Sequence, residues 1–326
     1  MNISRRNALV SLAVTTGAAA LTPLSAIAQS GVVNFVVPYP PGSAPDVLAR
    51  LISVKAQALL GQSIVVENRP GANAIIGSQY VSQARPDGSV YLLVDNTTIV
   101  ANPLLYSSLP YDPKALVGIT DVGRTNLMLT VRSNLPYTNW AEFVAYAKAN
   151  PGKVSIGTGG LGSVHHLSLE LIGQVTGTKL THVPYKGTSP AVQDMLSGQI
   201  DGVISGVETI RPHMSSGKVR PLAFGGQQRS ALLPEAPTLK ELGVDKQVLL
   251  PTTFTLFAPP RTPSSVSAKL ADAVRSVLAA PDTAARLTES GITPISSRSE
   301  DIPKELEILR AQVADVIKSA NIQLKQ

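Results

Sequence analysis

Short β-branched runs alternate along this chain with longer segments whose apolar residues recur at helical spacing. Val32 to Val37 is stopped by Pro38, and Asp46 then begins an amphipathic segment that is closed by Gly61. This pattern predicts a strand, a loop and a helix in that order. A strand at 63–66, a helix at 73–84 and a strand at 90–94 follow, with a turn before the last. The first part of the chain is therefore predicted to be a βαβαβ unit.

A second α/β unit is expected in the middle of the chain. After a looser stretch, strands are expected at 127–131, 154–156, 181–183, 202–205 and 221–224, with helices at 139–149, 163–175, 190–196 and 207–216. A strand at 252–258 then precedes helices at 264–279 and about 302–320. This order predicts two α/β lobes, each a mixed sheet flanked by helices, joined by strands that cross near 125–131 and 252–258. Ligands of such sheets lie beyond the carboxyl ends of strands, so the crevice between the lobes is the expected site.

The first 28 residues have the pattern of a signal peptide. Arg5 and Arg6 precede an apolar, small-residue stretch from Ala8 to Leu24, and Ala26-Ile27-Ala28 stands before Gln29. Threonines, a glycine and Pro23 interrupt that stretch, which argues against a membrane anchor. We expect export and a mature chain that begins near Gln29. The leader also resembles a twin-arginine signal, so the export route stays open.

Composition excludes several classes of function. Lys+Arg 28 against Asp+Glu 22 gives +6, and removing the two leader arginines leaves 26 − 22 = +4. These bases are scattered and aromatic residues are only 4%, so nucleic acid is not an expected partner. Cys 0 excludes thiol catalysis, and the 4 histidines lack metal-ligand spacing. We expect no metal and no cofactor.

Two loops at predicted strand ends could hold an anion. The loop 38–46 is rich in Gly, Pro and small residues and ends at a helix start, where backbone N–H groups attract negative charge. Asp46 itself is expected to cap that helix. Residues 157–162 match G-x-G-x-x-G, but the next strand ends without the acid that a dinucleotide requires. A carboxylate held by loop amides and Ser163 is the better interpretation.

Further polar residues follow other predicted strands. Asp95 and Thr98 could contact a ligand or could serve only as turn and cap residues. Lys186, in the loop 184–188, could contact a ligand or be a solvated surface charge. Glu208 and Arg211 are expected to pair on one helix face, because they stand three residues apart.

Several motifs resemble the Bordetella uptake gene (Bug) family, the receptors of tripartite tricarboxylate transporters. They are VVPYPPG at 36–42, VVENRPGA at 65–72, PDG at 86–88, LPYDP at 109–113, HVPYKG at 182–187 and FAP at 257–259. The resemblance runs from about residue 30 to the C-terminus. It implies a type II-like, two-lobed periplasmic binding protein that closes on a small carboxylate, either a di- or tricarboxylate or an aromatic carboxylate, and delivers it to an inner-membrane permease.

The resemblance also implies which residues contact the ligand. The family's contacts map onto Tyr39, Gly42, Ser43, Ala44, Thr98, Gly162, Ser163, His165, Tyr185 and Lys186. The chain departs from the family at Ser43, Asp95 and Ser205, where a Gly, a small neutral residue and an Asp are common. We include Asp95 and Ser205 in the predicted ligand site, because both changes alter the charge and hydrogen bonding of the pocket.

We therefore predict a monomeric, non-enzymatic receptor. Its expected parts are a signal peptide at 1–28, a first lobe of 29–126 and 253–326, and a second lobe of 127–252. Two alternatives remain open: a hydrolase or transferase that uses Ser163 and His165, and a ligand-sensing regulatory domain. Turnover assays on any bound ligand would separate a receptor from an enzyme.

Overall fold

The computed structural model describes residues 31–319 and residue 322. The predicted leader, residues 1–28, lies outside the described residues. Residues 32–326 belong to one structural unit, which contains two separate sheets. Across the described ranges, no helix combines the length and apolar character needed to cross a bilayer.

The first sheet has the strand order β2-β1-β3-β10-β4. Its strands are β1 (Val33–Val37), β2 (Ile64–Asn68), β3 (Val90–Asp95), β4 (Val117–Thr125) and β10 (Thr252–Ala258). β1 pairs in parallel with β2 and β3, and β10 is antiparallel to both β3 and β4. The accompanying helices are α1 (Ala44–Leu60), α2 (Ile75–Ser82), α3 (Asn96–Leu105), η1 (Pro113–Ala115), α8 (Ser264–Ala279), α9 (Pro281–Glu289) and α10 (Ile302–Ser319).

The second sheet repeats this plan with the order β7-β6-β8-β5-β9. Its strands are β5 (Leu127–Arg132), β6 (Ser155–Thr158), β7 (Thr181–Pro184), β8 (Gly202–Gly206) and β9 (Val219–Phe224). β6 is parallel to β7 and β8, and β5 is antiparallel to β8 and β9. The helices α4 (Trp140–Ala149), α5 (Val164–Thr176), α6 (Thr188–Ser197) and α7 (Val207–Met214) accompany it. Two mixed sheets flanked by helices confirm the predicted fold class.

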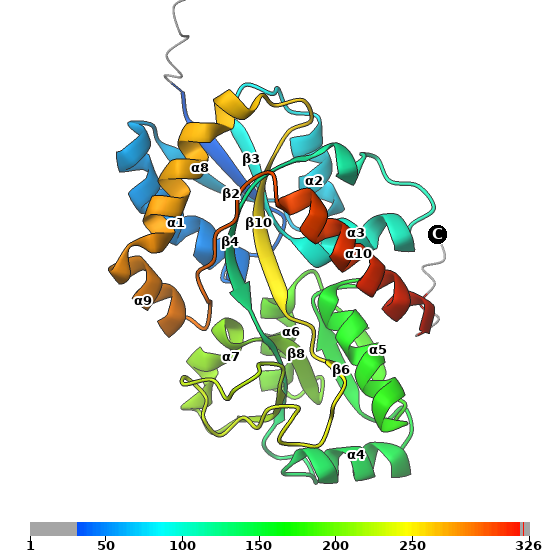
Figure 1. The fold of residues 1–326 in the computed structure, drawn as a ribbon. Coiled ribbons are helices and arrows are strands. Elements are labelled where there is room, and N and C mark those ends of the chain that lie inside the picture. Colours follow the sequence, from blue (N-terminus) through cyan, green and yellow to red (C-terminus); the bar gives the residue numbers. More distant parts are fainter. Residues whose placement is uncertain (1–30, 320–321, 323–326) are drawn as a thin grey trace, which may run out of the picture. The chain divides into compact units, whose positions relative to one another are not determined.

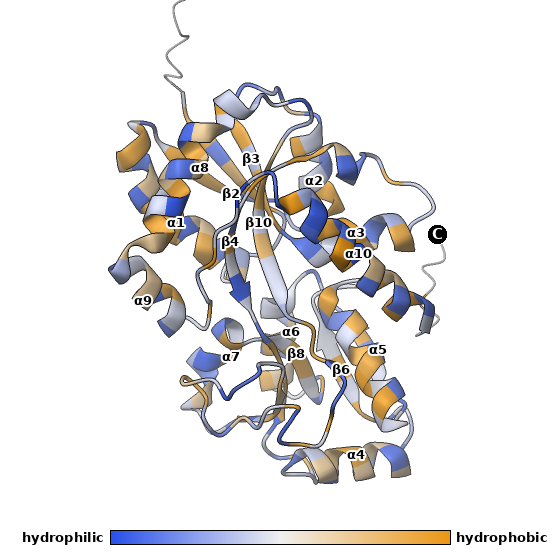
Figure 2. Cartoon of the chain, in the orientation of Figure 1, coloured by the Kyte–Doolittle hydropathy of each residue, from blue (hydrophilic) through white to orange (hydrophobic). Residues whose placement is uncertain are grey.

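The chain passes between the sheets twice, and β4 and β10 run side by side at these crossings (Figure 1). β4 ends at Thr125 and β5 begins at Leu127, while the return enters β10 at Thr252. A third connection is made by packing, because α10 lies on α3 of the first lobe and Val313 clusters with Leu167 of α5. Hydrophilic and hydrophobic residues alternate along α10, as expected for a helix with one packed side (Figure 2).

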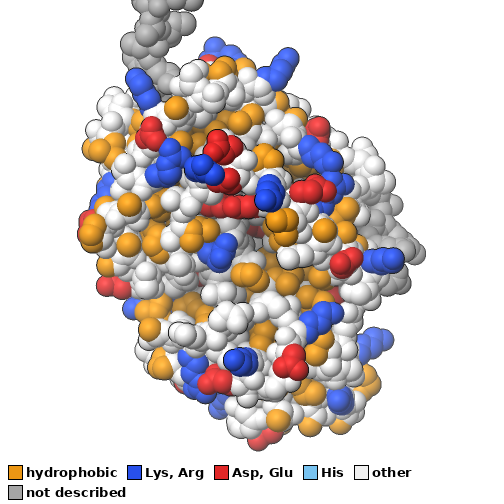
Figure 3. Space-filling model, in the orientation of Figure 1, with side chains coloured by type: hydrophobic (Ala, Val, Ile, Leu, Met, Phe, Trp, Pro, Cys, Tyr) orange, Lys and Arg blue, Asp and Glu red, His pale blue; other side chains and the backbone are white. Residues whose placement is uncertain are grey.

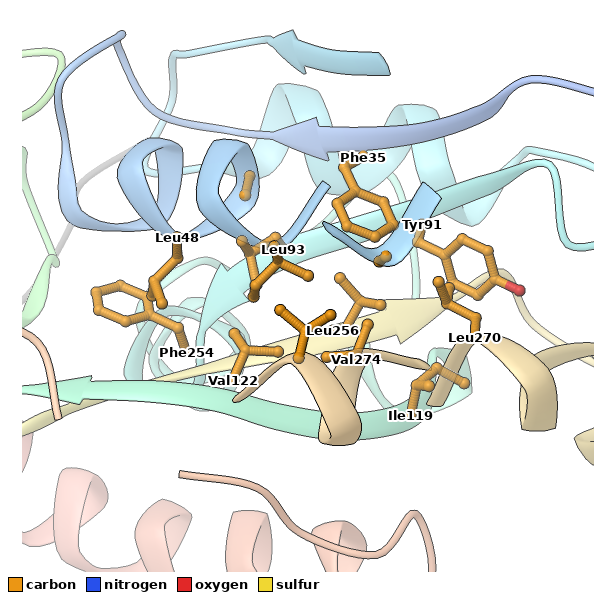
Figure 4. Close-up of a cluster of buried hydrophobic side chains, with 14 of the residues drawn as sticks. Phe35, Leu48, Tyr91, Leu93, Ile119, Val122, Phe254, Leu256, Leu270 and Val274 are labelled. Atoms are coloured by element: carbon orange, nitrogen blue, oxygen red, sulfur yellow. The ribbon is translucent and has the colours of Figure 1, made fainter. Parts of the chain in front are cut away.

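Each lobe has its own apolar core. In the first lobe, side chains from α1, β3, β4, β10 and α8 point toward one another (Figure 4). Phe35 and Leu93 are fully buried there, and the second lobe has a separate cluster around Phe143 and Ile156. Two separate cores allow each sheet to hold its own strand-end loops in place.

Besides the three-residue η1, three elements were not expected from sequence. α3 has four consecutive β-branched residues, 97–100, and contains Pro103, so its helix propensity is low, and burial against α10 and the sheet stabilises it instead. β4 contains Gly118 and Gly123, and its residues do not alternate cleanly in hydropathy. α9 is only 9 residues long and begins with Pro281.

Candidate functional site

Five helices begin at the edges of the two sheets that face each other. α1, α3, α5, α6 and α7 each follow a strand of a parallel set, namely β1, β3, β6, β7 and β8. Because the carboxyl ends of parallel strands lie at one edge of a sheet, the helices that follow them begin at that same edge. Ala44, Val164 and Thr188, the first residues of α1, α5 and α6, line a common cavity.

That cavity has a volume of about 40 Å³ and is lined by residues of both lobes. The lining residues are Tyr39, Ser43, Ala44, Pro45, Asp95, Thr98, Thr125, Leu127, Gly159, Ser163, Val164, His165, Gly187, Thr188, Glu208, Thr252 and Phe254. We call it the interlobe cavity. It has room for only a few water-sized groups.

Asp46 holds the loop before α1 in place. Ser43 is the N-cap residue, and its hydroxyl donates to the Pro40 carbonyl at 2.7 Å. Asp46 stands in the first turn of the helix, where its carboxylate accepts from the Gly42 N–H at 3.0 Å and the Asn68 amide at 2.9 Å. Asp46 therefore supports the helix start from its third position and is not the N-cap itself. Burial alone would raise its pKa, but hydrogen bonds from Arg50, Gly42 and Asn68 outweigh burial and lower it.

Asp95 is the N-cap of α3 and orients Tyr39. Its carboxylate accepts from the Thr98 N–H and the Thr98 hydroxyl, each at 2.7 Å, and from the Tyr39 hydroxyl. Asp95 is only 4% exposed, and burial raises its pKa although these donors partly oppose the shift. Burial and the neighbouring carboxylate also raise the pKa of Tyr39 well above its usual value. Asp95 thus has a clear capping role while lining the interlobe cavity.

The loop before α5 carries a similar arrangement in the second lobe. The Ser163 hydroxyl donates to the Gly160 carbonyl at 2.7 Å and accepts from the His166 N–H at 3.3 Å. The Gly162 N–H donates to His166 Nδ1 at 3.1 Å. His165 lines the cavity, and its buried Nδ1 has no partner within the described chain. Burial lowers the pKa of His165 to about 4, so the ring is neutral at pH 7.

Two predicted residues line a neighbouring cavity. Tyr185 and Lys186 belong to a space of about 210 Å³ that shares Tyr39 and Gly159 with the interlobe cavity. The Tyr185 hydroxyl donates to Asp194 at 2.7 Å, and burial together with that carboxylate raises the pKa of Tyr185 to about 12. The two spaces therefore meet at Tyr39.

The remaining predicted site residues do not line the interlobe cavity. Gly42 and Gly162 use their N–H groups inside their own loops, as described above. Ser205 is fully buried in β8, and its hydroxyl points to the Gly206 carbonyl at 3.4 Å. None of these three lines the interlobe cavity.

Several lining residues on the side of the crossings were not predicted from the sequence. Glu208 accepts from the Thr125 hydroxyl at 2.9 Å, whereas Arg211 donates to the Glu289 carbonyl, so the predicted Glu208–Arg211 pair is wrong. Burial raises the pKa of Glu208. Thr252, opposite Thr125 in the sheet register, also lines the cavity. In the sequence, a threonine next to a predicted crossing was the only feature that could have indicated these lining residues.

The charges on the protein are not distributed as on a surface that binds nucleic acid. Lys and Arg are scattered among acidic and uncharged side chains on the face shown in Figure 3. Among the described residues, neither a lysine nor an arginine lines the interlobe cavity. Its hydrogen-bond donors are instead hydroxyls and the N–H groups of helix starts, which helix geometry leaves without an intrahelical acceptor.

Two sheets of this plan around a shared cavity define the class of two-lobed periplasmic binding proteins. A family model described as the tripartite tricarboxylate transporter family receptor matches residues 48–322. The chain belongs to that family, which confirms the resemblance to the Bug receptors. The family and fold are those of periplasmic solute-binding receptors.

Similar proteins agree with this assignment. The chain is 35% identical to a UPF0065 protein of Pseudomonas sp. strain P51, over 89% of this chain and 87% of that protein. It is similar to the periplasmic binding protein BugD, with 30% identity, a TM-score of 0.85 and coverage of 90% and 99% of the two chains. It is also similar to Rpa4515 of R. palustris, solved with adipate, with 32% identity, a TM-score of 0.85 and coverage of 89% and 97%.

The bond between Tyr39 and Asp95 predicts a pH-dependent effect of Tyr39→Phe. The variant should lose about 1–3 kcal/mol of unfolding free energy at pH 8, because an ionised, buried carboxylate loses a donor. The Tyr39 bond lowers the Asp95 pKa, so that pKa should rise further in the variant. The loss should therefore shrink as pH falls toward 4 and Asp95 becomes protonated.

Urea unfolding at pH 4 and pH 8 measures both values. Tyr80→Phe is a suitable control, because Tyr80 is 37% exposed and its ring packs beneath Arg69. A loss in Tyr39→Phe that is the same at both pH values would show that this bond does not stabilise an ionised Asp95.

Proposed function

We propose that this chain is a non-enzymatic receptor that binds a small carboxylate in the interlobe cavity. The observation that carries the proposal is that the first residues of α1, α5 and α6 all line one cavity. Each helix start carries partial positive charge and unpaired N–H groups, which bind carboxylates. Since these groups come from both lobes, a bound carboxylate would hold the lobes together.

The relatives support the carboxylate class. Rpa4515, which has this fold and 32% identity, was solved with adipate. A cavity of about 40 Å³ is small for such a molecule, so entry requires the lobes to separate. We propose that they turn about the crossings at 125–127 and 251–252, and that the lobes divide as 29–126 with 253–326 against 127–252. A ligand that touches both lobes favours the closed state by its differential affinity.

Gly187 allows the lobes to approach each other. It precedes α6 with φ +126°, and a Cβ at this position would lie 2.5 Å from the Pro40 ring of the first lobe. At that distance the Pro40 ring or one of the two loops must shift. Gly187 and Pro40 are therefore proposed to meet only when the cavity is closed.

A hydrolase built on Ser163 and His165 is less well supported. The Ser163 hydroxyl donates to the Gly160 carbonyl. His165 Nδ1 accepts no hydrogen bond from that hydroxyl or from any other group of the described chain. A nucleophile needs an adjacent base that takes its proton. A ligand-sensing regulator would use the same cavity, but the family to which the chain belongs is one of transport receptors.

The transport role includes export and a membrane partner. We propose that residues 1–28 are removed as a signal peptide near Ala28 and Gln29, and that the mature protein acts in the periplasm. It would work as a monomer and hand its ligand to an inner-membrane permease. The family description supports the permease as the partner class.

A thermal-shift screen of the mature protein against small carboxylates tests the proposal. A ligand at a hundredfold excess over its Kd should stabilise the folded state by about 2.7 kcal/mol. The bound ligand should remain chemically unchanged, and small-angle scattering should show a smaller radius of gyration with it. Turnover of the ligand, or no stabilisation by any small carboxylate, would contradict the proposal.

Gly187→Ala is predicted to weaken ligand binding by roughly tenfold or more, because the closed state is blocked. Pro40→Ala removes the ring atoms that the new methyl group would meet, so the double variant should recover part of the affinity. Gly217→Ala is the control, because Gly217 also has a positive φ (+66°) but nothing within 4 Å of the added atom.

Calorimetry with the carboxylate found in the screen measures all four affinities. Equal loss in the single and the double variant would show that the Pro40 contact does not control closure.

A further inference from the structure

The interlobe cavity contains acidic side chains but no basic partner for them. Asp95 and Glu208 line it, and the only other titratable side chains among the described lining residues are Tyr39 and the neutral His165. A pocket that binds simple dicarboxylates would be expected to avoid acids, because like charges repel strongly at low dielectric. The two acids therefore need separate explanations.

The presence of Asp95 in the cavity is explained by its hydrogen bonds within the protein. Its two oxygens accept three hydrogen bonds, from Tyr39 and twice from Thr98, and it caps α3. These bonds use most of the acceptor capacity of the carboxylate.

Glu208 is placed differently. It lies in the first turn of α7, where one oxygen accepts from Thr125 at 2.9 Å and the other from Thr209 at 3.2 Å. Its own backbone N–H is a third donor, so at least one of the roughly four acceptor sites of the carboxylate stays unused. Glu208 lines the cavity beside the two crossings between the lobes, which places its remaining acceptor capacity within reach of a ligand.

A second polar side chain of the cavity, Thr252, has no hydrogen-bond partner among the described residues. Thr252 is 3% exposed, lines the cavity, and its hydroxyl has no partner in the part of the chain that the structure describes. Thr252 is the register partner of Thr125, which bonds Glu208. Buried polar groups are almost always satisfied, so a hydroxyl of this kind points to a bound polar group.

Resting on the proposed function, we infer that Glu208 is a specificity-determining residue that accepts a positively charged nitrogen of the ligand, so that the receptor selects amino carboxylates over matching acids without the amine. The carboxylate of such a ligand would lie at the starts of α1 and α5. Its ammonium group would donate to Glu208 and, through its other protons, to Thr252. The cavity thus has a donor end and an acceptor end.

Within the described part of the chain, no cation competes for Glu208. Arg211, one turn along α7, donates to the Glu289 carbonyl, and Arg124 of β4 donates to Thr253 at 3.1 Å. Asp95, Tyr39 and His165 are the titratable groups that share the cavity lining with it. Burial raises the Glu208 pKa, and an ammonium group would lower it again on binding.

Calorimetry with matched ligand pairs tests the inference. The probes are alanine with propionate and glutamate with glutarate, each measured on the wild type and on Glu208→Gln. In the wild type, the amino member of each pair that binds should bind roughly tenfold or more tightly than its partner. Glu208→Gln keeps the shape but removes the charge, so this preference should disappear. Asp245→Asn, at an exposed position, is the control and should keep the preference.

The pH dependence gives an independent measurement on the wild type. Affinity for the amino member should rise with pH through the Glu208 pKa, because only the ionised carboxylate attracts an ammonium group. Affinity for glutarate should not show this rise, because ionised Glu208 repels a carboxylate ligand that carries no ammonium group.

An unchanged preference in Glu208→Gln, or a wild type that binds the deaminated members equally well, would overturn the role of Glu208 and leave the carboxylate receptor intact. Failure of every small carboxylate in the broader screen would overturn the proposed function itself, and this inference with it.

Discussion

The unpaired N–H groups at helix starts are the physical feature on which the site depends. Parallel strands in both sheets deliver α1, α5 and α6 to one cavity, and Ala44, Val164 and Thr188 are the residues that meet there. Fixed backbone donors need no reorientation when an anion arrives, so they bind it without a buried lysine or arginine. The fold therefore supplies the chemistry of the site through its topology as well as through side chains.

Acidic residues give this site its particular form. Asp46 and Asp95 hold the loops of the first lobe by accepting hydrogen bonds from Gly42, Asn68, Thr98 and Tyr39. Neither acid has to meet the ligand to affect its binding, because each sets the position of groups that line the cavity. Glu208 accepts hydrogen bonds from two threonine hydroxyls and its own backbone N–H but positions no cavity-lining loop, and we therefore propose that it contacts the ligand.

Much of the fold follows from local sequence, and part of the site does not. The run ending at Pro38 predicts β1, and the apolar spacing after Asp46 predicts α1. α3 could not be predicted, because burial overrides the poor propensity of its β-branched residues. Motif resemblance indicated Tyr39, Ser43 and Ser163, whereas Glu208 was expected to pair with Arg211. Its true partner, Thr125, is distant in sequence and is brought close only by the crossing between the lobes.

A crystal structure with a small carboxylate bound tests the central claim most directly. The account predicts that the carboxylate oxygens accept hydrogen bonds from backbone N–H groups in the first turns of α1 and α5, one from each lobe. A carboxylate that instead forms an ion pair with Lys186 in the neighbouring cavity, away from those helix starts, would contradict it.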